Sequence, residues 1–212
     1  KMTHKEFRFF FNKKMTPVYP KAEIDSLYAQ LMGFALNISR ADMILKSAQT
    51  IENHSLTNLL EYIARLEKKE PIQYIIGQVN FAEVPVNVNN NVLIPRPETE
   101  SLVYWMKEQE QQNPSVLDIC TGSGCIAFAL EKHLNAKVNA WDVSYKALQL
   151  AKQTAKSIGS AVNFSKVDIL STVDTDQKWD IIVSNPPYVL EEERSEIDGN
   201  VLHYEPDLAL FT

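Results

Sequence analysis

The chain has 212 residues, of which 45% are hydrophobic and 23% are charged, and its net charge at pH 7 is −6. This length is sufficient for one medium-sized domain and a smaller one. The acidic balance argues against a general duplex-binding surface, although it leaves room for a local basic patch. No apolar run approaches the roughly 18–20 residues that span a bilayer. We expect a cytoplasmic, monomeric protein that binds neither membrane nor nucleic acid directly.

The two cysteines, Cys120 and Cys125, lie within one short stretch of the chain. Their spacing is neither Cys-x-x-Cys nor a zinc-binding pattern, so we expect free thiols in a reducing compartment. Residues from about 20 to 70 contain no cluster of metal ligands or nucleophiles, and the lone His54 there fits a surface residue better than a ligand. We therefore expect no metal site.

Residues from about 20 to 70 show the periodicity of helices. Apolar residues recur at steps of three and four in two runs: Ile24, Leu27, Leu31 and Phe34, then Leu56, Leu59, Leu60, Ile63 and Leu66. Ser39 and Ser55 are the expected N-caps. We predict a small helical bundle over residues 1–70, which serves for packing or for substrate recognition.

The periodicity changes after residue 70. Residues 73–77, 79–81 and 84–88 alternate polar and apolar side chains in short steps, which is typical of strands. We predict a β-hairpin linker over residues 71–95.

A proline-rich segment follows this linker. Pro95 and Pro97 hold Arg96 extended, and Pro97 is well placed as the first residue of a helix. Arg96, Glu98 and Glu100 fit two interpretations equally well. They are either surface charges that benefit from the helix dipole, or they line the mouth of a cofactor site.

A glycine-rich turn, residues 120–125, follows the predicted strand Ser115–Ile119. Gly122 and Gly124 permit a tight turn and the close approach of a ligand, and the helix that follows presents free N–H groups. The turn lacks both the Lys-Ser/Thr pair of a P-loop and the spacing GxGxxG. Asp118, just before the turn, would repel a pyrophosphate but suits an ammonium group, while the helix N-terminus suits a carboxylate. These features favour S-adenosyl-L-methionine over a dinucleotide.

Carboxylates also follow the next two predicted strands, residues 136–141 and 161–167. Asp142 lies about 20 residues beyond the glycine turn, where an acid usually accepts from ribose hydroxyls. It could instead cap the next helix, but the preceding turn favours the ribose. Asp168 can accept a hydrogen bond from an adenine amino group while Ile169 packs on the ring.

The fourth predicted strand, Trp179–Val183, has the β-branched run of a buried strand in a parallel sheet. It leads into Ser184-Asn185-Pro186-Pro187-Tyr188, whose two prolines end the strand. The Asn185 amide oxygen and the Pro186 carbonyl can accept both hydrogens of a planar amino group, beside the flat ring of Tyr188. Bent acceptance favours a pyramidal nitrogen, so the interaction strengthens towards the transition state. The alternative is an ordinary Asn-Pro turn without a function. The carboxylates at the three upstream strand ends favour a functional site over this alternative.

With these residues in place, the chain resembles the HemK/PrmC family, the protein-(glutamine-N5) methyltransferases that modify peptide-chain release factors. The resemblance runs from about residue 22 to residue 212. It is carried by Glu70–Gly77 (EPIQYIIG), Leu93–Glu100 (LIPRPETE), Asp118–Ala127, Ser184–Tyr188 and Glu205-Pro206. The first two segments are much more specific than the glycine turn, which class I methyltransferases share.

The resemblance implies an α/β fold, with a Rossmann-like class I methyltransferase domain over residues 96–212. It implies that the helical domain grips a release factor and that S-adenosyl-L-methionine is converted to S-adenosyl-L-homocysteine. The implied cofactor contacts are Cys120, Thr121, Gly122, Ser123, Gly124, Asp142, Ile169 and Asn185. It also implies that Asn185, Pro186, Pro187 and Tyr188 hold the glutamine of a Gly-Gly-Gln motif.

The chain departs from the family pattern in two places. Cys120 occupies a position where the family often has a glycine, which is tolerable if that position does not need a positive φ. The sequence also supplies four strands, whereas such a domain normally has about seven. We therefore expect a C-terminally incomplete sheet whose fourth strand is either exposed or completed by something else, and this puts the activity of this polypeptide in question.

The expected reaction is in-line transfer of a methyl group to the glutamine side-chain nitrogen, with catalysis mostly by positioning. No carboxylate is nominated as a general base. One alternative is a nucleic-acid methyltransferase acting on adenine N6 or guanine N2, which the acidic run at residues 191–193 disfavours. The others are a glutamine methyltransferase of a ribosomal protein and a non-catalytic module that keeps the cofactor fold.

Overall fold

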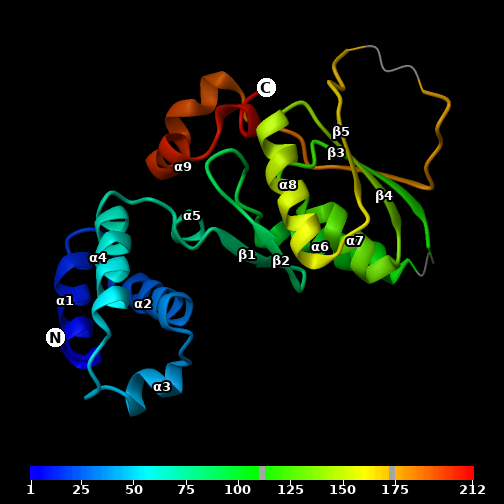
Figure 1. Ribbon diagram of the computed structural model, residues 1–212. Helices are drawn as coiled ribbons and strands as arrows, with labels where there is room; N and C mark the ends of the chain where they lie inside the picture. The colour runs from blue at the N-terminus through cyan, green and yellow to red at the C-terminus, as the bar shows by residue number, and fades with distance from the viewer. Residues whose placement is uncertain (110–112, 172–174) are drawn as a thin grey trace. The chain divides into compact units, whose positions relative to one another are not determined.

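The computed structural model describes residues 1–109, 113–171 and 175–212, and it divides into two compact units, residues 1–76 and 77–212 (Figure 1). Each unit has its own hydrophobic core. We predicted a boundary at residue 70 and a separate linker, but residues 72–76 belong to the first unit and the hairpin to the second. Within the described ranges, every helix is too short or too polar to cross a membrane.

The first unit is helical. Its elements are α1 (His4–Met15), α2 (Lys21–Leu36), α3 (Arg40–Leu45), α4 (Asn53–Glu67) and α5 (Ile72–Ile76). The two helices predicted from periodicity are confirmed as α2 and α4. Their inner faces meet α1 around side chains with no exposed surface: Phe7, Phe11, Leu31, Leu59 and Leu66.

The helix ends agree with the prediction at one position and not at another. Ser39 caps α3, because its side chain accepts from the Asp42 N–H at 3.1 Å while the Asp42 carboxylate accepts from the Ser39 N–H. Ser55 is not a cap, since α4 already begins at Asn53. Ser55 is instead the third residue of α4 and lies in the first turn of the helix.

The predicted strand over residues 73–77 is wrong, because these residues form most of α5. Ile72 and Ile75, three positions apart, are both buried in the helical core. A five-residue run offers too few positions to separate alternation from helical spacing, so packing decides between them. The predicted hairpin itself is confirmed in the second unit as the antiparallel pair β1 (Gln78–Phe81) and β2 (Val84–Asn87).

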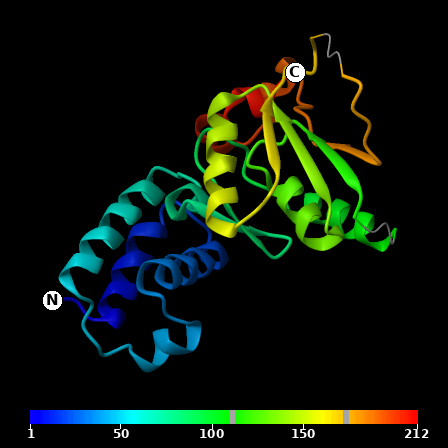
Figure 2. The same ribbon diagram turned by 45° about the vertical axis from the view of Figure 1, so that its right-hand side comes forward.

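The second unit contains a parallel sheet in the order β5-β4-β3-β6 (Figure 2). Its elements after the hairpin are α6 (Pro97–Glu108), β3 (Ser115–Ile119), α7 (Cys125–Leu134), β4 (Lys137–Asp142), α8 (Tyr145–Ile158), β5 (Asn163–Lys166) and β6 (Ile181–Ser184). Then follow two 3-10 helices and one α-helix: η1 (Glu191–Glu196), α9 (Gly199–Tyr204) and η2 (Asp207–Ala209). The α/β class, the four parallel strands and Pro97 at the first position of α6 are confirmed.

Strand β6 is an edge strand rather than a buried one. It pairs with β3 on one side, and no strand in the described residues pairs with its other side. Val183 is buried, but the Ile182 side chain is 62% exposed. The expectation of a buried strand was therefore wrong. Of the two alternatives for the edge of this strand, exposed or completed by something else, the described residues show the first.

Candidate active site

The register of the sheet brings three strand ends to one edge. Ile119 of β3 pairs with Trp141 of β4 on one side and with Ser184 of β6 on the other. The residue that follows each of them stands at the carboxyl edge of the sheet: Cys120, Asp142 and Asn185. In open parallel sheets, ligands bind outside this edge.

The glycine turn has three residues in the left-handed region, with φ of +60° at Cys120, +55° at Gly122 and +82° at Gly124. At Gly124, an added Cβ would lie 2.7 Å from a ring carbon of Phe128, so only glycine fits there. The condition under which a cysteine was expected to be tolerable at position 120 is not met, because Cys120 does adopt a positive φ. A side chain in this conformation costs roughly 1–2 kcal/mol, which the surrounding structure must offset.

The glycine turn is hydrogen-bonded to the neighbouring strand β4, and the pKa values of its two thiols are raised. The Thr121 N–H donates to the Trp141 carbonyl at 3.0 Å. Both cysteines are free, and burial raises the pKa of Cys120 and raises the pKa of Cys125 to about 12. Both shifts lower the fraction of thiolate, which is the reactive form of a cysteine.

Asp118 lies beneath the turn and is fully buried. Its Oδ2 accepts from the Thr121 hydroxyl at 2.6 Å, while Oδ1 has no hydrogen-bond partner among the described residues. Burial raises the pKa of Asp118 to about 7, although the Thr121 hydroxyl and the Ala127 backbone lower it. Direct contact with an ammonium group stays a prediction, and it requires the turn to move.

Asp142 binds the turn from the side. Its Oδ2 accepts from the Gly122 N–H and its Oδ1 from the Ser144 N–H, each at 2.8 Å. Ser144 caps α8 by accepting from Ala147, so the alternative that Asp142 is the cap was wrong. The bond to Gly122 was not foreseen. Each carboxylate oxygen keeps a free acceptor position, and contact with a ribose stays a prediction.

Asp168 and Ile169 follow β5, and both are exposed. The Asp168 carboxylate accepts from the Leu170 N–H at 3.0 Å and from the Ser171 hydroxyl at 3.1 Å, which closes a local turn. The Ile169 side chain is 41% exposed, which leaves apolar surface beside that turn. Contact of these two residues with an adenine stays a prediction.

The Asn-Pro-Pro-Tyr corner, residues 185–188, begins where β6 is fastened to β3. The Ser184 hydroxyl donates to the Ile119 carbonyl at 2.9 Å. Within the described parts of the chain, neither the Asn185 side chain nor the Pro186 carbonyl makes a hydrogen bond. Tyr188 is 72% exposed. Both proposed acceptors are therefore available to a ligand.

One residue of this region was missed as a functional candidate. Glu205 is buried, and its carboxylate accepts from the Ile94 N–H at 3.0 Å and from Arg96 Nη2 at 2.7 Å. Arg96 is thus neither a plain surface charge nor free to line a cofactor mouth. Glu205 was noted only within the family resemblance, and nothing local in the sequence connects it to residues more than 100 positions earlier.

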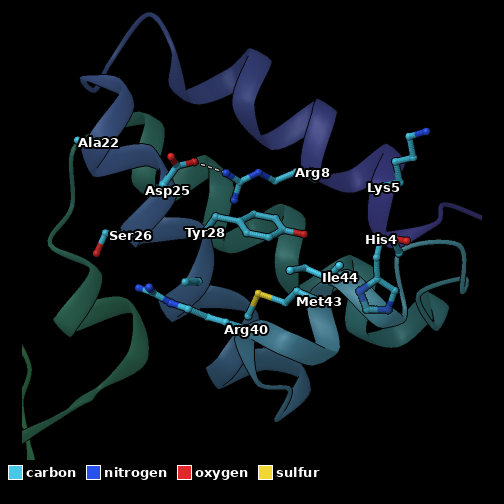
Figure 3. A pocket seen from close by; sticks show the side chains of 12 residues that line it. His4, Lys5, Arg8, Ala22, Asp25, Ser26, Tyr28, Arg40, Met43 and Ile44 are labelled. Carbon is cyan, nitrogen blue, oxygen red and sulfur yellow. Dashed lines mark hydrogen bonds and ion pairs between the residues drawn. The ribbon is translucent and has the colours of Figure 1, made fainter.

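A cavity of about 650 Å³ lies in the helical unit, between α1, α2 and α3 (Figure 3). Arg8 forms an ion pair with Asp25, and its guanidinium stands 4.1 Å from the centre of the Tyr28 ring. Lys5 and Arg40 also line the cavity, and neither forms an ion pair within the described ranges. None of the predicted site residues lies there.

Two family models match the chain. Residues 97–203 match the methyltransferase small domain, and residues 19–77 match the PrmC N-terminal domain. A release factor glutamine methyltransferase of Flavobacterium psychrophilum is 42% identical over 216 residues, which are 99% of this chain and 76% of that protein. The chain belongs to the release factor glutamine methyltransferase family. The family resemblance predicted from the sequence is confirmed.

A further family member, from Bacteroides thetaiotaomicron, is 39% identical over 95% of this chain and 73% of that protein. The chain thus spans about three quarters of the length of these two relatives. The structure of a methyltransferase from Pyrococcus furiosus can be superposed on this chain with a TM-score of 0.42 and 19% identity. The match covers 65% of this chain and 64% of the Pyrococcus chain. That likeness is too weak to carry an argument about function.

Proposed function

We propose that this methyltransferase transfers a methyl group from S-adenosyl-L-methionine to N5 of a glutamine in the Gly-Gly-Gln motif of a peptide-chain release factor. Membership of the family supports the substrate class. The observation that carries the proposal is the pair of free acceptors, the Asn185 amide oxygen and the Pro186 carbonyl, at the carboxyl edge of the sheet.

The acceptor pair suits the chemistry of an amide nitrogen. The lone pair of a carboxamide nitrogen is delocalised, so the nitrogen attacks only as it becomes pyramidal. Asn185 and Pro186 would accept its two N–H hydrogens, and the exposed ring of Tyr188 would lie against the planar amide. These bonds are stronger in the pyramidal transition state than in the ground state, which lowers the barrier. The proton is lost after methylation, so no general base is needed.

The glycine turn suits the cofactor. Gly124 leaves no room for a side chain, and the N-terminus of α7 has no side-chain cap, so its N–H groups suit the carboxylate of an amino-acid head group. We assign this contact to Cys120, Thr121, Gly122, Ser123 and Gly124, while Asp118 beneath them would accept from the ammonium group of the same head group. Asp142 would bind the ribose, and Asp168 and Ile169 would contact the adenine. Asn185 would lie between the cofactor and the glutamine and contact both. The cofactor supplies the electrophilic methyl group.

The helical unit is proposed to recognise the release factor. Its cavity combines Lys5 and Arg40, two cations without an ion-pair partner among the described residues, with the apolar side chains of Met43 and Ile44 (Figure 3). Such a surface suits a partner segment that carries both acidic and apolar side chains.

The test of the proposed function is the variant Asn185→Ala, assayed with methyl-labelled cofactor and a release factor. We expect turnover to fall by about 100-fold or more, because an acceptor made only in the transition state is lost. Cofactor affinity and release-factor affinity should change little, since the glycine turn and the helical unit are untouched. Asn163→Ala, at an exposed position of β5, is the matched control and should keep full activity.

Three outcomes of this assay would contradict the proposal. The first is full activity of Asn185→Ala, and the second is equal methylation of a release factor whose Gly-Gly-Gln glutamine is replaced. The third is preferential methylation of RNA, DNA or a ribosomal protein offered in parallel, which would support the corresponding alternative. A wild-type chain that binds the cofactor but methylates none of these would be a binding module.

A further inference from the structure

Residues 189–212 fold back beside the Asn-Pro-Pro-Tyr corner, and we call them the C-terminal brace (orange and red in Figure 1). Val189 follows the corner directly. Its N–H donates to the Leu210 carbonyl and its carbonyl accepts from the Thr212 N–H, each at 3.0 Å. The backbone that leaves the corner is therefore fixed by the far end of the brace.

Arg194 ties the brace together internally. Its guanidinium donates to the Glu191 carboxylate at 2.6 and 3.1 Å and to the Asp207 carboxylate at 3.3 and 3.4 Å. The same group lies 3.9 Å from the centre of the Phe211 ring. These contacts join η1, η2 and the bridge to Val189, so a displacement at one end of the brace is transmitted to the other.

Glu205 anchors the brace to the start of α6. Its side chain is only 2% exposed, and its two oxygens bind the Ile94 N–H and Arg96 Nη2. Arg96 is the residue before Pro97, where α6 begins, so the anchor is a rigid element. A buried carboxylate is unfavourable unless it is paired, so the brace docks well only while both partners are in place.

We propose that Arg96 and Glu205 form a positioning pair that holds the Asn-Pro-Pro-Tyr corner in the geometry needed for the acceptor amide. This inference rests on the proposed function, because it concerns the acceptor side of that site. Neither residue touches the reacting atoms. The pair acts through the brace on Val189, and through Val189 on Asn185 and Pro186. Small misplacement of such groups lowers the rate strongly while the cofactor side remains intact.

The decisive variant is Glu205→Gln. Its amide oxygen can still accept from Ile94, but the charge-assisted bond to Arg96 is lost. We expect kcat/KM for the release factor to fall by about 10-fold, with cofactor Kd within twofold, since one such bond is typically a tenfold effect. Hydrogen exchange of the Val189 and Thr212 amides should accelerate by a similar factor, because the brace opens more often. The single variant Arg96→Lys keeps a positive charge opposite Glu205. It should therefore keep most of the wild-type kcat/KM and most of the wild-type protection of the Val189 and Thr212 amides.

Glu70→Gln is the matched control, since it makes the same change in the Arg65–Glu70 pair of the helical unit. It should leave exchange at Val189 unchanged. Unchanged exchange in Glu205→Gln, or a loss of cofactor affinity as large as the loss of kcat/KM, overturns the positioning role. If circular dichroism shows that Glu205→Gln is unfolded, Arg96→Gln and Arg96→Lys decide by the same two readouts. A wild-type chain without activity defeats the proposed function, while the exchange measurement still tests the pair.

Discussion

The glycine turn and the Asn-Pro-Pro-Tyr corner meet at the same sheet edge but are stabilised in different ways. The turn is held from within the sheet, by the buried Asp118 below it and by Asp142 beside it. Among the described residues, the Asn185 side chain and the Pro186 carbonyl make no hydrogen bond, and the corner is fixed through Val189 by Leu210 and Thr212. We infer that the proposed cofactor side is encoded locally, in the consecutive strands β3 and β4. The acceptor side is tied through Glu205 to Ile94 and Arg96, which lie more than 100 positions before Glu205.

The largest expected effect is that of Gly124→Ala, which attacks the locally encoded side. Its Cβ would meet the Phe128 ring in a backbone that side chains rarely adopt, so we expect a loss of about 3 kcal/mol in unfolding free energy. Cofactor binding should be lost as well. Denaturant titration and calorimetry measure the two effects.

Gly159→Ala provides the comparison for that variant. Gly159 has φ of +70° but open space around its would-be Cβ, so strain alone should cost about 1 kcal/mol. Equal losses in the two variants would show that close packing against Phe128 contributes nothing.

A smaller effect is expected from the pH dependence of Asp118. Its folded-state pKa of about 7 lies above the value of 3.8 expected in the unfolded chain, so the folded state binds the extra proton between these values. The unfolding free energy should therefore fall as pH rises from 5 to 8, by about 2 kcal/mol. Asp118→Asn should remove this fall, as thermal unfolding at both pH values would show. An identical pH profile in the variant would mean that the buried carboxylate does not titrate in this range.

The smallest effect is expected for Asp142→Ala, which removes the tie between β4 and the turn. We expect cofactor affinity to fall by about 10-fold, because the proposed ribose acceptor and the support of Gly122 are both lost. The exchange rate of the Val189 amide should stay as in wild type. Calorimetry that finds unchanged affinity would remove Asp142 from the cofactor site, and faster exchange at Val189 would remove the distinction between the two sides.

Sequence patterns predicted the elements that depend on neighbouring residues. The parallel strands, the start of α6 at Pro97 and the cap at Ser39 all follow from side chains within a few positions. The short α5 was mistaken for a strand because five residues are too few to separate the two periodicities.

The remaining errors share another cause, which is that tertiary contacts decide the outcome. The positive φ of Cys120 comes from the hydrogen bonds around the turn, not from its own preference. The exposure of Ile182 depends on which strand lies beside β6, and the pairing of Arg96 depends on Glu205. No local pattern carries that information.

The bond between Glu205 and the Ile94 amide also has a consequence for the growing polypeptide. During synthesis, the glycine turn can close once β4 has emerged from the ribosome, because all its partners are then made. The acceptor corner must wait until the stretch containing Glu205 has been translated. A nascent chain would thus complete the hydrogen bonds of the glycine turn before the anchor of the Asn-Pro-Pro-Tyr corner at Glu205 exists.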